Sequence, residues 1–207
     1  MSNILLVRHG ESKWNVENRI QGWAASELTE RGEKETRRTA EYINENWEVS
    51  QIITSDLVRA VQTAKIIQNS ISPKVPISEE SLWREQDFGP YQGFTDEEYA
   101  DILSSDNNME SSKPVQRGET PYDVRKRTMD AIEKIDTDVQ GVPVIVTHSG
   151  PIVQIIGNVY GYDPIESYDN ISISNNQIIH CDITDGIQIV SGYSAVDRFD
   201  DEILSRN

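Results

Sequence analysis

The fold of this chain is decided by one stretch near its start, Ile4-Leu5-Leu6-Val7-Arg8-His9-Gly10-Glu11-Ser12. Its first four residues form a short, uninterrupted apolar run, which is typical of a strand buried on both faces of a sheet. The strand ends at Arg8 and His9, so a guanidinium and an imidazole follow directly on rigid backbone. In open α/β sheets, ligands bind outside the carboxyl ends of the strands, and we therefore expect the functional site here.

Other segments of the chain repeat this layout of a short strand followed by a helix. Short apolar runs predict further strands at Gln51 to Thr54, Leu82-Trp83 and Val142 to Thr147. Apolar residues at three- and four-residue steps predict helices from Thr29 to about Trp47, from Ser55 or Asp56 onward, from Thr120 to Asp136 and from Ser149 to Gly161. Thr29, Ser55 or Asp56, and Ser149 are the expected N-caps. The sheet-facing residues of the second helix are expected to be Val58, Val61, Ala64, Ile66 and Ile67.

Strands that alternate with helices predict an α/β fold with a largely parallel sheet and helices on both faces. Asp185-Gly186, between the apolar runs Ile171 to Ile183 and Ile187 to Val190, predicts an antiparallel hairpin. Residues 86–118 are rich in Gly, Ser, Asn, Asp and Pro, which predicts an irregular excursion with one short helix near Asp96 to Leu103. The length of 207 residues fits one domain spanning residues 1–207.

The composition argues against several classes of function. A formal net charge of -16 and a pI near 4.5 disfavour binding to nucleic acid or to an anionic membrane, both of which need a basic surface. Cys181 is the one cysteine, so an intrachain disulfide and a multi-cysteine metal site are excluded. The N-terminal apolar run is too short for a signal or membrane segment, and we expect a cytoplasmic protein. The acidic composition is compatible either with a high-salt cytoplasm or with an ordinary acidic enzyme.

Side chains that suit phosphoryl chemistry fall at or just past predicted strand ends, namely His9, Arg59, Glu85 and His148. A phosphoryl centre needs a nucleophile, cations around the equatorial oxygens and an acid for the departing oxygen. An imidazole attacks through an unprotonated nitrogen, and His9 is placed for this role. Arg8 and Arg59 would bind phosphate oxygens through paired donors. His148, which precedes a helix N-terminus, would stabilise negative charge.

The order and spacing of these residues resemble the histidine phosphatase superfamily, also called the phosphoglycerate mutase-like family. Residues 6–12 resemble its nucleophile motif, and the loop that follows matches at Asn15, Arg19, Gln21 and Gly22. Residues 28–32 resemble the start of its first long helix, and residues 55–64 resemble the segment with its second phosphate arginine. Residues 146–150, Val-Thr-His-Ser-Gly, match its second histidine motif. The resemblance covers roughly residues 4–195.

This resemblance implies a three-layer α/β/α sandwich in which residues 86–118 form a small insertion over the active site. Residues 82–89 resemble the segment whose glutamate, four residues before a glycine, donates a proton, which assigns the acid to Glu85. The implied reaction needs no metal and no cofactor. His9 takes the phosphoryl group from a small-molecule phosphate ester, and water activated by Glu85 then hydrolyses the phosphohistidine. The residues expected to bind substrate are Asn15, Arg19, Gln21, Gly22 and Ser149; the oligomeric state stays open.

The sequence leaves alternatives for several residues. Arg59 could pair with Asp56 instead of a ligand, and Glu11 or Asp87 could take the place of Glu85. Arg19 and Gln21 could anchor their loop instead of contacting a ligand. His180 and Cys181 could be core residues, and Trp14 and Trp23 could belong to the core or to the wall of the pocket.

Three functions are compatible with these features. The leading hypothesis is a phosphatase that acts on a small phosphorylated metabolite. A phosphoglycerate mutase would share the first step, but such mutases usually carry a longer insertion with added basic residues. Here residues 86–118 hold Lys113 and Arg117 against seven acidic residues. A catalytically silent domain that binds a phosphorylated partner is disfavoured, because every expected catalytic group is present.

Overall fold

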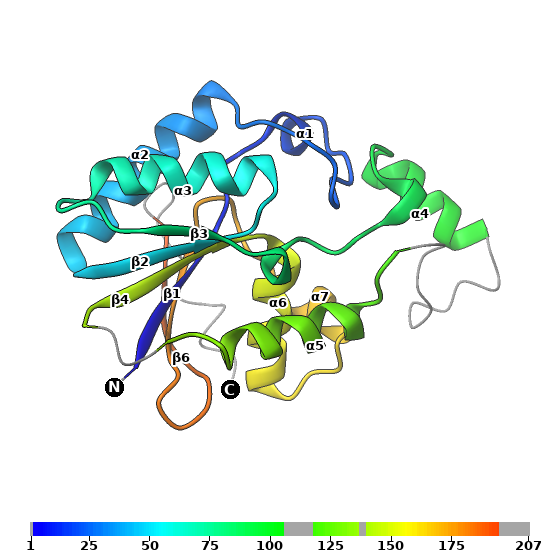
Figure 1. Ribbon diagram of the computed structural model, residues 1–207. Helices are drawn as coiled ribbons and strands as arrows, with labels where there is room; N and C mark the ends of the chain where they lie inside the picture. The colour runs from blue at the N-terminus through cyan, green and yellow to red at the C-terminus, as the bar shows by residue number, and fades with distance from the viewer. Residues whose placement is uncertain (1, 106–117, 137–139, 195–207) are drawn as a thin grey trace.

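The computed structural model describes residues 2–105, 118–136 and 140–194, and within these residues six strands form one sheet in the order β3-β2-β4-β1-β5-β6 (Figure 1). The strands are β1 (Asn3–Arg8), β2 (Val49–Thr54), β3 (Ile77–Glu79), β4 (Val142–Thr147), β5 (Ile178–Asp182) and β6 (Gln188–Tyr193). The pairs from β3 to β1 are parallel, whereas β1 with β5 and β5 with β6 are antiparallel. The predicted mostly parallel sheet with a C-terminal hairpin is confirmed.

Helices cover both faces of this sheet, as Figure 1 shows. α2 (Glu30–Asn46) and α3 (Val58–Ser70) lie on one face. α5 (Pro121–Ile132), α6 (Ser149–Tyr160) and α7 (Glu166–Asn170) lie on the other. α1 (Lys13–Val16) and α4 (Asp96–Ser105) stand beyond the carboxyl ends of the parallel strands, and none of the helices in the described ranges is long and apolar enough to cross a membrane. The three-layer α/β/α architecture implied by the resemblance is confirmed.

The apolar run of β1 explains why this strand occupies the middle of the sheet. Ile4, Leu5, Leu6 and Val7 are all fully buried. Leu5 and Val7 pack into a core with α2 and α3, whereas Ile4 and Leu6 pack into a second core with α5 and α6. Successive side chains of a strand point to opposite faces, so a strand covered on both faces needs an uninterrupted apolar run.

Two predicted helix caps are wrong. The N-cap of α3 is Leu57 rather than Ser55 or Asp56, and the N-cap of α6 is His148 rather than Ser149, which is the first helical residue. The hydroxyl of Ser55 lies 2.8 Å from Nε2 of His148. His148 thus occupies the N-cap position of α6, but its side chain bonds to Ser55 and makes no capping hydrogen bond to its own helix.

The predicted sheet-facing side of α3 is also partly wrong. Val58 is 39% exposed, and the buried residues of this helix are Arg59, Ala60, Thr63, Ala64 and Ile67. The Thr63 hydroxyl accepts a hydrogen bond from the backbone N–H of Gly10 at 3.0 Å. Arg59 and Thr63 are therefore buried, whereas hydrophobicity alone places valine and isoleucine side chains on the buried side of this helix.

Three other predicted elements differ from the structure. Leu82 and Trp83 belong to a 3-10 turn, η1 (Ser81–Trp83), and the strand in this region is the three-residue β3. A pair of apolar residues has no periodicity, so it cannot distinguish a strand from a turn. The helix predicted from Thr120 to Asp136 is α5, which already ends at Ile132. The apolar run predicted from Ile171 to Ile183 becomes a strand, β5, only at Ile178, so the segment between α7 and β5 is a loop.

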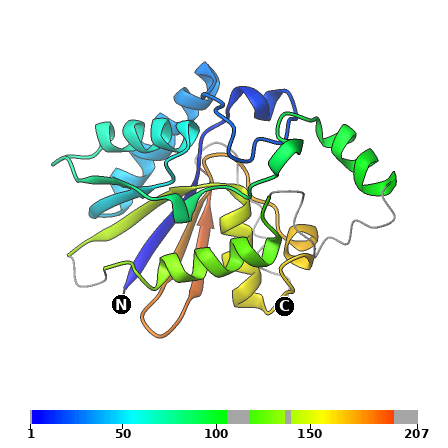
Figure 2. The same cartoon turned by 45° about the vertical axis from the view of Figure 1, so that its right-hand side comes forward.

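Two segments that are far apart in sequence lie side by side above the carboxyl edge of the sheet. Arg19, after α1, forms an antiparallel bridge with Thr95, which precedes α4. The backbone N–H of Asp96 also donates to the Asn18 carbonyl at 3.0 Å. Figure 2 shows these two segments side by side above the strand ends. Part of the expected 86–118 excursion, residues 106–117, lies outside the described residues.

Candidate active site

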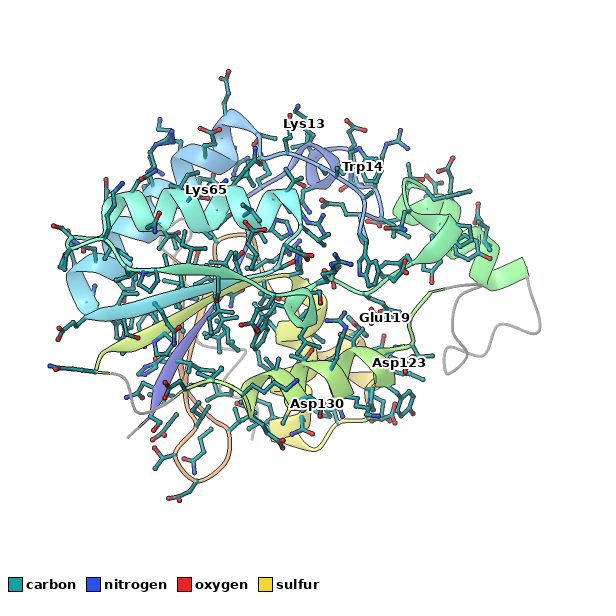
Figure 3. The ribbon with its side chains drawn as sticks, in the orientation of Figure 1. Lys13, Trp14, Lys65, Glu119, Asp123 and Asp130 are labelled. Atoms are coloured by element: carbon teal, nitrogen blue, oxygen red, sulfur yellow. The ribbon has the colours of Figure 1, made fainter. Side chains whose placement is uncertain are left out.

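A cavity of about 270 Å³ opens at the carboxyl end of β1. In Figure 3, Trp14 of α1 and Glu119 before α5 lie on opposite sides of this edge of the sheet. The cavity is lined by Arg8, His9, Trp14, Asn15, Asn18, Arg19, Ile20, Gln21, Gly22, Arg59, Glu85, Phe88 and Asp96. The structure therefore brings together His9, both arginines and Glu85, although they come from three separate parts of the chain.

The imidazole of His9 is held in one orientation at the base of the cavity. Its Nδ1 lies 2.7 Å from the carbonyl oxygen of Gly10, and its Nε2 accepts a hydrogen bond from Nε of Arg59 at 3.2 Å. A carbonyl can only accept, so the proton sits on Nδ1 and the lone pair on Nε2. Burial, followed by the charges of Arg59 and Arg8, holds the pKa of His9 well below its ordinary value. His9 is therefore neutral, with its nucleophilic nitrogen facing a guanidinium.

Arg59 reaches the cavity from the first turn of α3. Its Nη1 and Nη2 donate to the carbonyl oxygens of Ala24 and Gly22 at 3.1 and 2.7 Å. Burial lowers its pKa to about 10, so the guanidinium stays charged at neutral pH. The alternative pairing of Arg59 with Asp56 is wrong, because Asp56 accepts hydrogen bonds from Arg84, one of them at 2.7 Å.

Arg8 supplies a second guanidinium, which is partly buried. Its Nη1 donates to the carbonyl of Ile173, in the loop before β5. Its Nε is buried and has no hydrogen-bond partner in the described part of the chain. Burial lowers the pKa of Arg8, an effect that the carboxylate of Glu85 opposes. Nε of Arg8 is thus a donor that the described part of the protein leaves unused.

His148 stands behind the cavity rather than in its lining. Its side chain is fully buried, and its ring centroid lies 5.1 Å from that of His9. Burial, and next the charge of Arg59, hold its pKa well below the ordinary histidine value. Nδ1 of His148 is buried with no partner among the residues described. His148 is thus a neutral polar group beside His9 at the N-terminus of α6.

Glu85 also lines the cavity. Its Oε1 accepts hydrogen bonds from the backbone N–H groups of Gly150 and Gln86, both at 3.0 Å. A Cβ on Gly150 would lie 2.2 Å from this oxygen, so only glycine leaves room for the carboxylate at the start of α6. The other candidate carboxylates are committed elsewhere and do not line the cavity: Glu11 accepts from Thr29, and Asp87 accepts from Gly89.

Four of the five residues expected to bind substrate line the cavity, and Ser149 does not. The side-chain oxygen of Asn15 accepts from the backbone N–H of Ser12 at 3.0 Å, and that of Gln21 accepts from the Ser12 hydroxyl at 2.8 Å. Arg19 donates to Glu17 and to the Gly93 carbonyl. These side chains therefore both line the cavity and anchor their loop. For Arg19 and Gln21, the sequence left open whether they anchor the loop or contact a ligand, and their positions are compatible with both.

The sequence does not predict how the backbone of Glu85 is held. Its carbonyl oxygen accepts from Nε1 of Trp23 at 2.8 Å and from Nη2 of Arg127 at 3.0 Å. Arg127 is fixed by two hydrogen bonds to the carboxylate of Glu119, at 2.8 and 2.9 Å. No local spacing signals these contacts, because they join segments about 40 to 60 residues apart.

Among the described residues, no group of three His, Cys, Asp or Glu side chains is arranged to hold a metal ion.

Comparisons with known proteins agree with this geometry. The model of the histidine phosphatase superfamily (branch 1) matches residues 4–195. The uncharacterized phosphatase PhoE of Bacillus subtilis is 32% identical over 170 residues, covering 79% of this chain and 80% of that protein. The probable phosphoglycerate mutase GpmB of Enterobacter sp. is 29% identical over 199 residues, covering 93% of this chain and 90% of that protein.

Solved structures give the same result. YhfR of Bacillus stearothermophilus superimposes with a TM-score of 0.81 at 27% identity and covers 92% of this chain and 96% of that one. Phosphoserine phosphatase of Entamoeba histolytica, solved with 3-phosphoglyceric acid, gives a TM-score of 0.76 at 25% identity, with 94% and 98% covered. The latter structure shows a similar protein with a small phosphorylated metabolite bound.

The two buried histidines predict how stability depends on pH. In the unfolded chain each imidazole has a pKa of about 6.5, whereas in the folded protein both pKa values are held lower. Below this pH the unfolded state binds protons that the folded state does not, so stability decreases as the pH falls. Between about pH 7.5 and 5.5, we expect the two residues to lower the free energy of unfolding by roughly 2–3 kcal/mol.

Urea denaturation at high ionic strength, followed by tryptophan fluorescence, measures this decrease. The His148→Gln variant removes one of the two titrating groups and should lose about half of the pH dependence that they cause. The same pH dependence in the variant and the parent protein would show that buried neutral histidines do not account for it.

Proposed function

Because this chain is an enzyme that belongs to branch 1 of the histidine phosphatase superfamily, we propose that it hydrolyses phosphate monoesters of small metabolites through a phosphohistidine on His9. The observation that carries the proposal is the state of His9. Its Nδ1 is tied to the Gly10 carbonyl, and the lone pair of Nε2 faces Arg59. A neutral imidazole with an available nitrogen, next to a fixed cation, is what attack on a bound phosphate requires.

In the first step, Nε2 of His9 attacks phosphorus, and the bond from phosphorus to the substrate oxygen breaks. Arg8 and Arg59 bind the equatorial oxygens, on which the charge of the transition state is spread. His148 and the N-terminus of α6 contribute further polar groups behind His9. Binding of the phosphate would draw Nε–H of Arg59 from His9 to a phosphate oxygen, which frees the attacking nitrogen.

Glu85 donates a proton in the first step and accepts one in the second. As the acid it protonates the leaving oxygen, so the product departs as a neutral alcohol. As a carboxylate it then takes a proton from water, and the resulting hydroxide attacks the phosphohistidine. Inorganic phosphate leaves, and both His9 and Glu85 return to their starting states. The residues proposed to bind substrate around them are Asn15, Arg19, Gln21 and Gly22.

The charges around the cavity favour water over a second substrate hydroxyl as the final acceptor. Beyond Arg8, Arg59 and Glu85, the charged residues of the described lining are Arg19 and Asp96. A mutase must also hold the second phosphate of a bisphosphorylated species, and one cation opposed by one carboxylate is a poor site for a dianion. We further propose that residues 1–207 are one catalytic domain, and that the described part of the 86–118 segment, residues 86–105 and 118, covers the substrate. The likeness to GpmB keeps phosphoglycerate mutase as the second candidate.

The nucleophile is tested by trapping the intermediate. His9→Ala should abolish turnover and incorporation of radioactive phosphate from a labelled monoester, because no other imidazole reaches the cavity within the described structure. The parent protein should retain a label that is labile in acid and stable in base after rapid quenching. His180→Ala is the matched control, since His180 bonds to Asn3 at the far end of β1. A label that persists in His9→Ala would exclude the assignment.

The position of the acid is tested through Gly150. The methyl group of Gly150→Ala would displace the Glu85 carboxylate from the start of α6. A misplaced acid costs on the order of 10²-fold, so kcat should fall by about 10- to 100-fold while inorganic phosphate still binds. Asn158→Ala, an exposed position later in the same helix, should keep full turnover. Parent-like kcat in Gly150→Ala would contradict the role of Glu85.

Hydrolysis is distinguished from mutase activity by following free phosphate. Both monophosphoglycerates, with and without a bisphosphorylated primer, are incubated with the protein alongside other phosphate monoesters. We expect phosphate release that does not depend on primer, because water is the acceptor. Primer-dependent exchange between the phosphoglycerates without phosphate release would overturn the phosphatase proposal and establish the second candidate.

A further inference from the structure

Three consecutive residues, Gly22-Trp23-Ala24, contact both ends of the proposed reaction centre. The carbonyl oxygens of Gly22 and Ala24 accept hydrogen bonds from the two terminal nitrogens of Arg59. Between them, the indole N–H of Trp23 donates to the carbonyl oxygen of Glu85 at 2.8 Å. One short piece of backbone therefore fixes a phosphate-binding guanidinium and the residue that carries the acid.

The indole of Trp23 is itself held from the outer side. The guanidinium carbon of Arg84 lies 4.5 Å from the centroid of the Trp23 ring, which is the geometry of a cation–π contact. Arg84 is anchored by two hydrogen bonds to the carboxylate of Asp56, and this pairing raises the pKa of Arg84 and lowers that of Asp56. The backbone N–H of Trp23 also donates to the side chain of Gln92.

A role in packing alone does not explain this arrangement. The Trp23 side chain is 38% exposed and belongs to neither hydrophobic core. An exposed indole loses little by directing its N–H to water, so its fixed bond to a backbone carbonyl next to the cavity indicates a positional role. Gly22, at φ +47°, permits the turn, because a Cβ there would collide with Gln92.

We propose that Trp23 is a positioning residue that couples Arg59 to Glu85, so that the acid is correctly placed relative to the phosphate that Arg59 holds. This inference rests on the proposed function, in which Glu85 protonates the leaving oxygen. Nε1 of Trp23 and Nη2 of Arg127 together fix the Glu85 carbonyl, and the N-terminus of α6 fixes its carboxylate. Loss of the indole donor leaves the Glu85 carbonyl held by Arg127.

A positional role for the acid makes a specific prediction about the leaving group. An unactivated alcohol needs its oxygen protonated as it departs, whereas p-nitrophenolate leaves without an acid. Trp23→Phe removes the N–H donor and keeps a smaller aromatic ring for Arg84. We expect kcat/KM for glycerol 2-phosphate to fall at least about fivefold more than kcat/KM for p-nitrophenyl phosphate. Arg84→Gln, which keeps the donor but removes the stacked cation, should shift the ratio in the same direction by less.

The controls separate this inference from the function on which it rests. Trp47→Phe makes the same chemical change where the ring packs on Tyr42 and Tyr193, away from the cavity, and should leave the ratio unchanged. Glu85→Gln should give the largest leaving-group dependence. If Glu85→Gln shows that dependence and Trp23→Phe lowers both substrates equally, the coupling role of Trp23 is refuted. If Glu85→Gln itself shows none, the proposed acid is wrong.

Discussion

The placement of one buried and one partly buried guanidinium beside His9 is the constraint around which the site is organised. Taking a charge out of water costs several kcal/mol unless it is well bonded, and neither Arg8 nor Arg59 forms an ion pair within the described residues. Backbone carbonyls from the 22–24 loop and from the segment before β5 compensate part of this cost. The part of the cost that is not compensated leaves a local positive potential at the site, although the whole protein carries a net charge of -16. A dianion of the right size can bind to this positive region.

Much of the fold could be predicted from the sequence because its central strands leave little choice. The uninterrupted apolar runs of β1 and β4 fit only strands covered on both faces, and Thr29 caps α2 as expected. The sequence is misleading where its local pattern is weak or where polar groups are buried. The two-residue apolar run Leu82-Trp83 suggests a strand but forms a turn, and the buried side of α3 includes a threonine that accepts a hydrogen bond from the backbone of Gly10.

The candidate site could be predicted in outline for a related reason. Residues that follow strands of a parallel sheet converge at one edge, so His9 and its partners lie together although the sequence separates them widely. What holds these residues in place could not be predicted. Arg59 and Glu85 are fixed through backbone carbonyls and backbone N–H groups, which every residue possesses, and such contacts leave no signature in residue type.

The position of β1 also determines when the site can exist. Its neighbours in the sheet are β4 and β5, which are synthesised about 140 and 175 residues later. The turn before β5 completes the floor of the site, since Asn175 donates to the His9 carbonyl and Asn176 to that of Arg8. During synthesis, His9 therefore emerges long before the segments that orient it. The site can assemble only after β4, β5 and the turn before β5 have been added to the chain.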